Sequence, residues 1–416
     1  MDPRLRSWRY RVFAATWLCY VGYYFCRKPF SIAKGQLGEQ LHLDASALGT
    51  IGAAYLIAYA LGQFLSGVLG TRFGGRVMLL TGMAVSIAMN IGFGMAATTN
   101  ALLMLMTVNG LAQATGWSAN VGTMASWFHR HERGKVMGWW TTNFQVGGVA
   151  ANAMASWMLG HFDYQAAFFS GAAVLLAVFM VVLFNQRNRP EDVGLPPVDD
   201  PVAPGDAAGE SKGLGWNNKV LTNLALIAVV YFFLKFIRYA LWSWAPFFLA
   251  KNFGLGAGDA GYFSTIFDVC GIPGVIITGW LSDRFFRSRR AGVSLVMLVL
   301  LTASCLLLFV GGQVSLPIFA VGIGLVGFTL YGPDALLTGA GVMDIGSRRG
   351  ATLAAGLMSG VGSSGAVLQD LVIGKLYDAD GGDLSRIFQL LLGSAIMATL
   401  VMTVVVVRNR IGKSDV

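Results

Sequence analysis

A series of long apolar runs constrains the fold of this chain more than any other feature. A run of about 20 mainly apolar residues can cross a bilayer as an α-helix, which satisfies its own backbone hydrogen bonds there. The 416-residue chain is 55% hydrophobic and 12% charged, whereas about 25% of the residues in a soluble domain are charged. We therefore predict an all-α membrane protein with twelve spans. The expected ranges are 10–33, 48–70, 77–97, 101–125, 136–160, 165–184, 220–250, 259–281, 291–311, 316–338, 349–373 and 386–407.

The segment between the sixth and seventh runs divides the chain. It contains RNRPEDVGLPPVDDPVAPGDAAGESKG, and this richness in Pro, Gly and acids is typical of an irregular linker. We expect two six-helix halves, residues 1–184 and 220–416, joined by a linker at 185–219.

Positive charge is distributed unevenly between the loops. Lys and Arg concentrate in the terminal segments, the linker and every second loop, whereas the opposite loops carry Lys34, Lys251, Lys375 and Arg386. By the positive-inside rule, both termini and the linker are expected in the cytoplasm. The first run is long, carries charges and lacks a small-residue cleavage site, so we expect no cleaved signal peptide. Because the net charge of +9 resides in these loops, it does not indicate nucleic acid as a partner.

Two pairs of cations interrupt the apolar runs. Arg27 and Lys28 lie near the end of the first run, and Lys235 and Arg238 lie in the seventh. A charge at membrane depth costs several kcal/mol. Either these side chains extend to the membrane interface, or they face a wet cavity and meet an anion. Their similar places in the two halves favour two sides of one anion-binding site.

Other apolar runs contain two acids, Asp268 and Asp334, so the four cations exceed the acids within the runs by two. Unpaired buried charge is unfavourable unless a ligand supplies the counter-charge. A phosphate monoester carries about −1.5 to −2 charges, and a guanidinium can bind two of its oxygens at once. We expect Asp268 to pair with Lys235 or Arg238 in the empty protein, as a coupling residue or as a structural salt bridge. Titration of Asp268 or Asp334 would instead indicate a proton-coupled anion carrier.

Several polar and aromatic residues accompany these cations. Tyr20 and Tyr24 precede Arg27 at helical spacing, and their hydroxyl groups either bind the ligand or only pack. Trp117 either stacks on the ligand or packs. Lys235 and Arg238, three residues apart, share one helical face. We see no catalytic arrangement, nucleotide-binding loop or metal-ligand spacing, so we expect neither an enzyme nor a cofactor.

Two loops resemble the signature of the major facilitator superfamily. GVLGTRFGGR follows the second run, and GWLSDRFFRSRR follows the eighth. The second copy keeps the acid of the signature at Asp283, whereas Thr71 replaces it in the first. This resemblance implies the major facilitator fold, with twelve transmembrane helices in two six-helix bundles around a central cavity, and alternating access.

A second resemblance narrows the expected function. GYYFCRKPFSIAKGQL is similar to the first-helix motif of the organophosphate:phosphate antiporter family, and NFQVGG, RPEDVGLPPV, RYALWSWAPFFL and YGPDALLTGAGVMD agree with it. The resemblance implies that Arg27 and Arg238 bind phosphate and that Asp268 matches an acid of the family. We expect Asp268 and Asp334 to take part in coupling. The expected substrate-binding residues are Arg27, Arg238, Lys28, Lys235, Tyr20, Tyr24, Gln63, Trp117, Asn143, Gln145 and Tyr331.

Three positions depart from the relatives. Gln63 replaces a common substrate-site Lys, and Phe144 and Lys235 replace a His and a Tyr of the glycerol-3-phosphate transporter. The organic substrate is therefore open, while the phosphate-binding arginines are present. We expect a monomeric carrier, in a bacterial inner membrane, that exchanges an organic phosphate for inorganic phosphate. A transporter-like sensor of a phosphorylated metabolite and a proton-coupled anion carrier are the alternatives.

Overall fold

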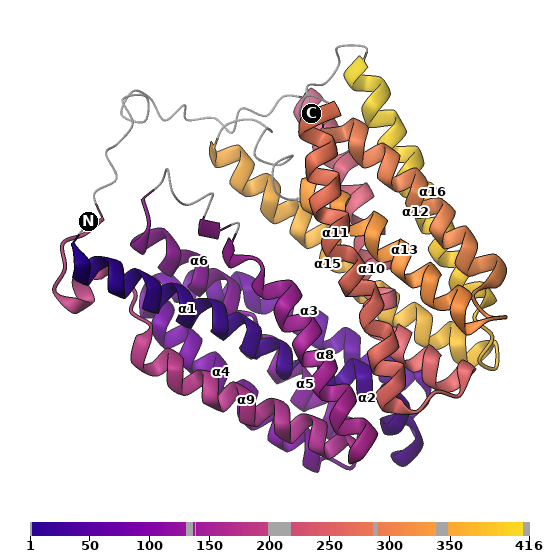
Figure 1. Cartoon of the computed structure of the whole chain (residues 1–416), viewed down its shortest axis with the longest axis horizontal. Helices are drawn as coiled ribbons and strands as arrows, with labels where there is room; N and C mark the ends of the chain where they lie inside the picture. Colours follow the sequence, from indigo (N-terminus) through magenta and orange to yellow (C-terminus); the bar gives the residue numbers. More distant parts are fainter. Residues whose placement is uncertain are drawn as a thin grey trace. The chain divides into compact units, whose positions relative to one another are not determined.

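The computed structural model describes residues 2–129, 136–137, 139–198, 218–285, 290–337 and 348–410. This part of the chain consists of helices and their connections, without a strand (Figure 1). The loop at 130–135, the linker beyond 198 and the segment 338–347 lie outside the described residues. The α-helices are α1 (Pro3–Phe25), α2 (Lys28–Gln40), α3 (Ala45–Phe73), α4 (Gly75–Met95), α5 (Thr99–Gln113), α6 (Thr115–Trp127), α8 (Asn143–His161), α9 (Tyr164–Asn185), α10 (Asn218–Phe253), α11 (Ala257–Phe285), α12 (Arg290–Gly311), α13 (Leu316–Ala335), α15 (Arg348–Ala379) and α16 (Ser385–Arg410).

The described helices account for the twelve expected spans, which confirms the predicted fold class. Eight of them are long and apolar enough to cross a membrane by length and composition alone. Helices α2, α5 and α6 fall short because they have 13, 15 and 13 residues. Each belongs to a span that is split into two helices.

The first span is split at Cys26 and Arg27, where α1 ends and α2 begins. Proline has no backbone N–H, so Pro29 cannot donate the helical hydrogen bond to the carbonyl oxygen of Phe25. The neighbouring carbonyl oxygen of Cys26 accepts a hydrogen bond of 3.0 Å from Asn109 Nδ2. The prediction of one continuous helix over 10–33 was therefore wrong: the chain breaks at the first cationic pair and then continues as a helix to Gln40.

The chain divides into two compact units. The first contains Met1–Leu43, Ala54–Ala207 and Gly256–Tyr262, and the second contains Asp44–Ala53, Ala208–Leu255 and Phe263–Val416. The starts of α3 and α11 belong to a different unit from the rest of these helices, and the two six-helix halves stay a prediction.

In the first unit, α1 packs against α8 and α9, and α4 lies beside α9 (Figure 1). A buried cluster that includes Cys19, Tyr23 and Met83 joins α1 to α4, α6 and α9. In the second unit, α10 lies along α15 and α16, and α12 packs against α13 and α16.

The beginning of the expected linker is ordered on the first unit. Arg76 donates hydrogen bonds to the carbonyl oxygens of Leu183, at 2.5 Å, and Gln186, and so caps the C-terminal end of α9. The backbone N–H of Arg76 donates to Asn188 Oδ1 at 2.7 Å. A 3₁₀ helix, η1 (Pro190–Val193), follows. Residues 186–193 of the expected linker are therefore held against the first unit.

Candidate functional site

Arg27 lies at the helix break of the first unit, among three tyrosine rings. Its guanidinium carbon is 5.2 Å from the ring centre of Tyr24, 5.7 Å from that of Tyr55 and 4.9 Å from that of Tyr59. Its Nε donates a hydrogen bond of 3.1 Å to Gln113 Oε1. Aromatic faces attract a cation without neutralising it. The first unit therefore holds a half-buried guanidinium that keeps its charge.

Tyr20 connects this arginine site to a cluster of aromatic rings. Its hydroxyl group is 3.4 Å from that of Tyr59, and its ring lies 6.1 Å from Trp117 and 5.1 Å from Phe144. Trp117 stacks on Phe144 at 5.7 Å and is 36% exposed. Trp117 therefore packs on aromatic neighbours and still keeps an accessible face, so both roles that we considered are compatible with its position.

The other expected polar residues of the first unit differ in their surroundings. Gln63 follows Tyr59 by four residues on α3, so the two lie on one face of the helix; Gln63 is half-buried, as is Gln145 on α8. Asn143 is fully buried, and its Nδ2 donates to the carbonyl oxygen of Trp140 at 2.6 Å. This amide donor is thus committed to the backbone of Trp140, three residues before the start of α8.

Both lysines of α2 are buried. Lys28 is 1% exposed and Lys34 is 0% exposed. The expected span ended at residue 33 and left Lys34 in a loop; this was wrong, because α2 continues to Gln40 and Lys34 is buried within the protein. Its ammonium group lies 5.5 Å from the centre of the Phe30 ring.

The second unit brings the other cationic pair to an acid. Arg238 Nη1 is 2.6 Å from Asp334 Oδ2, and Lys235 Nζ is 3.9 Å from Asp334 Oδ1. The cations come from α10 and the acid from α13. The Arg238 and Asp334 side chains are 22% and 11% exposed. Unlike Arg27, Arg238 therefore lies against a carboxylate.

Asp268 is hydrogen-bonded to a tyrosine that lies beside Arg238. Its Oδ1 accepts a hydrogen bond of 2.6 Å from the hydroxyl group of Tyr331. The Tyr331 ring in turn lies under Arg238, with 4.6 Å between the guanidinium carbon and the ring centre. The described salt bridges of Lys235 and Arg238 go to Asp334, and the pairing of Asp268 with one of these cations stays a prediction. The sequence alone does not show whether Asp268 or Asp334 lies nearer to the cations of α10, because both acids lie on other helices.

A third buried acid escaped the sequence analysis. Asp370 on α15 is 2% exposed, and its Oδ1 accepts hydrogen bonds from Trp244 Nε1 at 2.7 Å and Ser243 Oγ at 3.2 Å. Its place inside the expected span 349–373 was a signal that could have revealed it. Among the described residues, the structure thus adds Arg9 and Lys34 to the buried cations and Asp370 to the buried acids.

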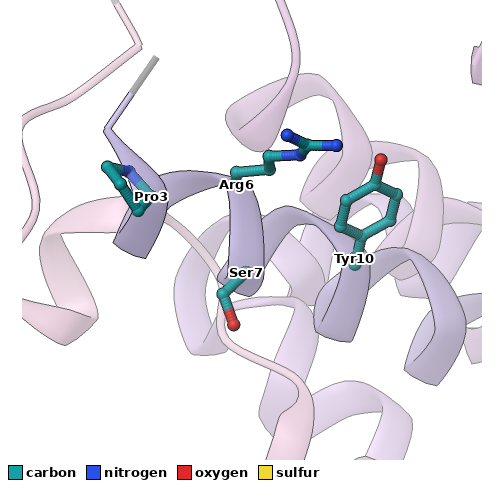
Figure 2. A pocket seen from close by; sticks show the side chains of 4 residues that line it. All are labelled: Pro3, Arg6, Ser7 and Tyr10. Atoms are coloured by element: carbon teal, nitrogen blue, oxygen red, sulfur yellow. The ribbon is translucent and has the colours of Figure 1, made fainter.

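A shallow pocket lies apart from these residues, at the start of α1. It is lined by Pro3, Arg6, Ser7 and Tyr10 (Figure 2). The Arg6 guanidinium carbon is 5.9 Å from the centre of the Tyr10 ring. Because none of the buried charges lines this pocket, we do not assign the substrate to it.

Comparisons with known proteins agree with the motifs. The sequence profile of the Major Facilitator Superfamily matches residues 16–369. The glycerol-3-phosphate transporter of Bacillus subtilis (strain 168) is 29% identical over 96% of this chain and 92% of its own length. The membrane sensor protein UhpC of Salmonella typhimurium is 26% identical over 91% of this chain and 87% of its own length.

A probable hexose phosphate transport protein of Chlamydia pneumoniae is 26% identical over 92% of this chain and 88% of its own length. Among solved structures, a bacterial homologue of the human lysosomal transporter Spinster, inward-facing and occupied, has a TM-score of 0.75. It covers 98% of this chain and 99% of its own at 13% identity, a likeness that concerns the fold alone. The chain therefore belongs to the Major Facilitator Superfamily, and its curated relatives match the organophosphate:phosphate antiporter family that its first-helix motif indicated.

Proposed function

We propose that this protein exchanges an organic phosphate ester for inorganic phosphate by alternating access. Arg27 of the first unit and Arg238 of the second are its phosphate-binding residues. The membrane is a bacterial inner membrane with both chain termini in the cytoplasm. The observation that carries the proposal is that each unit holds one arginine against tyrosine rings. The names of the relatives support a phosphorylated substrate.

The two arginines have different partners in the empty protein. Arg27 donates to the neutral amide of Gln113, whereas Arg238 lies 2.6 Å from the Asp334 carboxylate. An anion meets no competing acid among the measured partners of Arg27. At Arg238 it competes with Asp334 for the same guanidinium. We therefore propose that phosphate binds Arg27 first and that its competition with Asp334 couples binding to the conformational change.

A sensor is the second candidate function. The likeness to UhpC favours it, because a sensor also binds its phosphorylated ligand. The two candidates differ in flux: a carrier exchanges substrate through many cycles, whereas a sensor binds it without sustained exchange.

Counterflow in proteoliposomes tests the proposal. Vesicles are loaded with unlabelled phosphate and diluted into a trace of radiolabelled phosphate, and uptake is measured for the wild type, Arg27→Ala and Arg238→Ala. We expect rapid uptake by the wild type and at least a tenfold loss in each variant. Arg386→Ala is the matched control, because Arg386 is an arginine that pairs with Asp380 and is 66% exposed.

Uptake by either site variant at the wild-type rate would overturn the assignment of that arginine. Binding of phosphate by the wild type without any counterflow would favour the sensor. Parallel assays with glycerol 3-phosphate and hexose phosphates as the external substrate then identify the organic partner.

A further inference from the structure

A second helix break lies directly beside Arg27. Helix α5 ends at Gln113 and α6 begins at Thr115, so this span too is divided. Gln113 is the last residue before the break and is 0% exposed. Because the amide of a glutamine must be hydrogen-bonded when it is buried, its partners define what it does.

All four hydrogen-bonding positions of the Gln113 amide are used. Oε1 accepts from Arg27 Nε at 3.1 Å and from the Tyr55 hydroxyl group at 2.9 Å. Nε2 donates to Ser86 Oγ at 3.2 Å and to Asn109 Oδ1 at 3.3 Å. A reversed amide would point N–H groups at the donor Nε of Arg27, so the contacts permit a single orientation.

The same network also holds the backbone next to Arg27. Ser86 Oγ donates to Asn109 Oδ1 at 2.6 Å, and Asn109 Nδ2 donates to the carbonyl oxygen of Cys26 at 3.0 Å. The side chain of Arg27 and the helix break beside it are thus fixed by one set of buried neutral groups. Buried networks in which every member is satisfied restrict side chains to one arrangement.

We propose that Gln113 is a positioning residue that presents Arg27 to the phosphate. Its oxygen occupies Nε, whereas among the described residues the two terminal nitrogens of Arg27 make no hydrogen bond. This leaves the end of the guanidinium for two phosphate oxygens, the bidentate geometry that arginine favours. A neutral partner orients Arg27 and preserves its full charge. The inference rests on the proposed function.

Three variants of the full-length protein test this role. Gln113→Met removes the amide at similar size, and Gln113→Glu keeps the shape but adds a carboxylate next to Arg27. Gln186→Met is the matched control, because Gln186 is another 0% exposed glutamine of the first unit, whose Nε2 donates to Thr123 Oγ1 at 3.1 Å. For each protein we measure the Kd for inorganic phosphate, the KM and maximal rate of phosphate exchange, and the Tm without ligand.

A hydrogen bond to a charged group contributes about 1.5–3 kcal/mol, so we expect Gln113→Met to raise the phosphate Kd and KM by about tenfold or more. Gln113→Glu should raise them further while its Tm stays at or above that of Gln113→Met, since the carboxylate pairs with Arg27. A purely structural residue would lower the Tm and leave the phosphate affinity unchanged. Gln186→Met should lower Tm and keep the wild-type Kd.

A phosphate Kd for Gln113→Met within twofold of the wild type, with wild-type exchange intact, would overturn the role of Gln113 and leave the proposed function standing. If the wild type itself neither binds nor exchanges phosphate, the proposed function falls, and the role of Gln113 falls with it.

Discussion

Replacement of Asp334 by Asn tests the competition at Arg238 most directly. The substitution preserves the size of the side chain and an oxygen acceptor, but it removes the negative charge 2.6 Å from Arg238 Nη1 and 3.9 Å from Lys235 Nζ. Two half-buried cations then lose the acid that they share. We expect phosphate to bind more tightly, because it no longer competes with this carboxylate.

The magnitude follows from the burial of the pair. Two unit charges about 4 Å apart attract by about 4 kcal/mol at the effective dielectric of a protein surface, and solvent reduces this value at side chains that are 22% and 11% exposed. A charge-assisted hydrogen bond contributes about 1.5–3 kcal/mol net, which corresponds to about 10- to 100-fold in Kd. We therefore expect the phosphate Kd of Asp334→Asn to fall by at least tenfold.

Thermal unfolding and tracer exchange on the same purified protein measure the effect. The Tm without ligand should fall, because the cations are uncompensated, and the rise in Tm with phosphate should be larger than in the wild type. Exchange should slow, because Asp334 no longer helps to displace the bound phosphate. Asp380→Asn is the control: it removes a salt bridge of 3.0 Å to Arg386, whose side chain is 66% exposed, and exposed pairs contribute little. An unchanged or weaker phosphate affinity in Asp334→Asn would refute the competition.

Two further predictions concern the neighbours of this pair. Asp268→Asn should reduce the rate of exchange more than the phosphate affinity, because Asp268 accepts a hydrogen bond of 2.6 Å from the hydroxyl group of Tyr331, whose ring lies beneath Arg238. Unchanged exchange kinetics would exclude a coupling role. Lys235→Tyr and Gln63→Lys should each impair exchange, the first by a deficit and the second by an excess of positive charge. The double variant should recover phosphate exchange and shift its preference toward glycerol phosphate, whereas normal transport by Lys235→Tyr alone would exclude Lys235 from the site.

The spans and the cationic pairs could be predicted because both are local properties of the sequence. Apolar runs give the helices, and charges within these runs stand out whatever the tertiary structure. The break at Arg27 was also within reach: Pro29 removes a helical donor, and its effect on Phe25 is set by spacing alone. The extension of α2 to Gln40 was missed because the apolar run was taken to end at residue 33, just before Lys34.

The partners of the charges could not be predicted in the same way. Whether Arg238 meets Asp268 or Asp334 depends on how α11 and α13 pack against α10, which a single sequence does not encode in its periodicity. Gln113 lies in an apolar run with small neighbours, and its role depends on the second break and on Ser86 and Asn109 from other parts of the chain. Buried polar side chains of this kind become informative only when their partners are known.

The last prediction concerns the glycine that packs against the break. A Cβ added to Gly171 of α9 would collide with the carbonyl oxygen of Phe25, and Pro29 Cγ lies 3.7 Å away. This carbonyl cannot move freely, since it belongs to the turn that positions Arg27. Gly171→Ala should therefore destabilise the protein by about 1–3 kcal/mol, the usual effect of overpacking, and should also weaken phosphate binding by displacing the backbone before Arg27.

The matched control is Gly393→Ala in α16, where an added Cβ meets no atom within 4 Å. Alanine is more favourable than glycine within a helix by about 1 kcal/mol, so this variant should keep or raise Tm and retain wild-type phosphate affinity. The two identical substitutions thus have opposite expected signs, because only one of them faces a backbone group. If Gly171→Ala behaved like Gly393→Ala in both Tm and Kd, the contact of α9 with the carbonyl group of Phe25 would not help to fix the helix break. The position of Arg27 would then depend on the Gln113 network and the tyrosine rings alone.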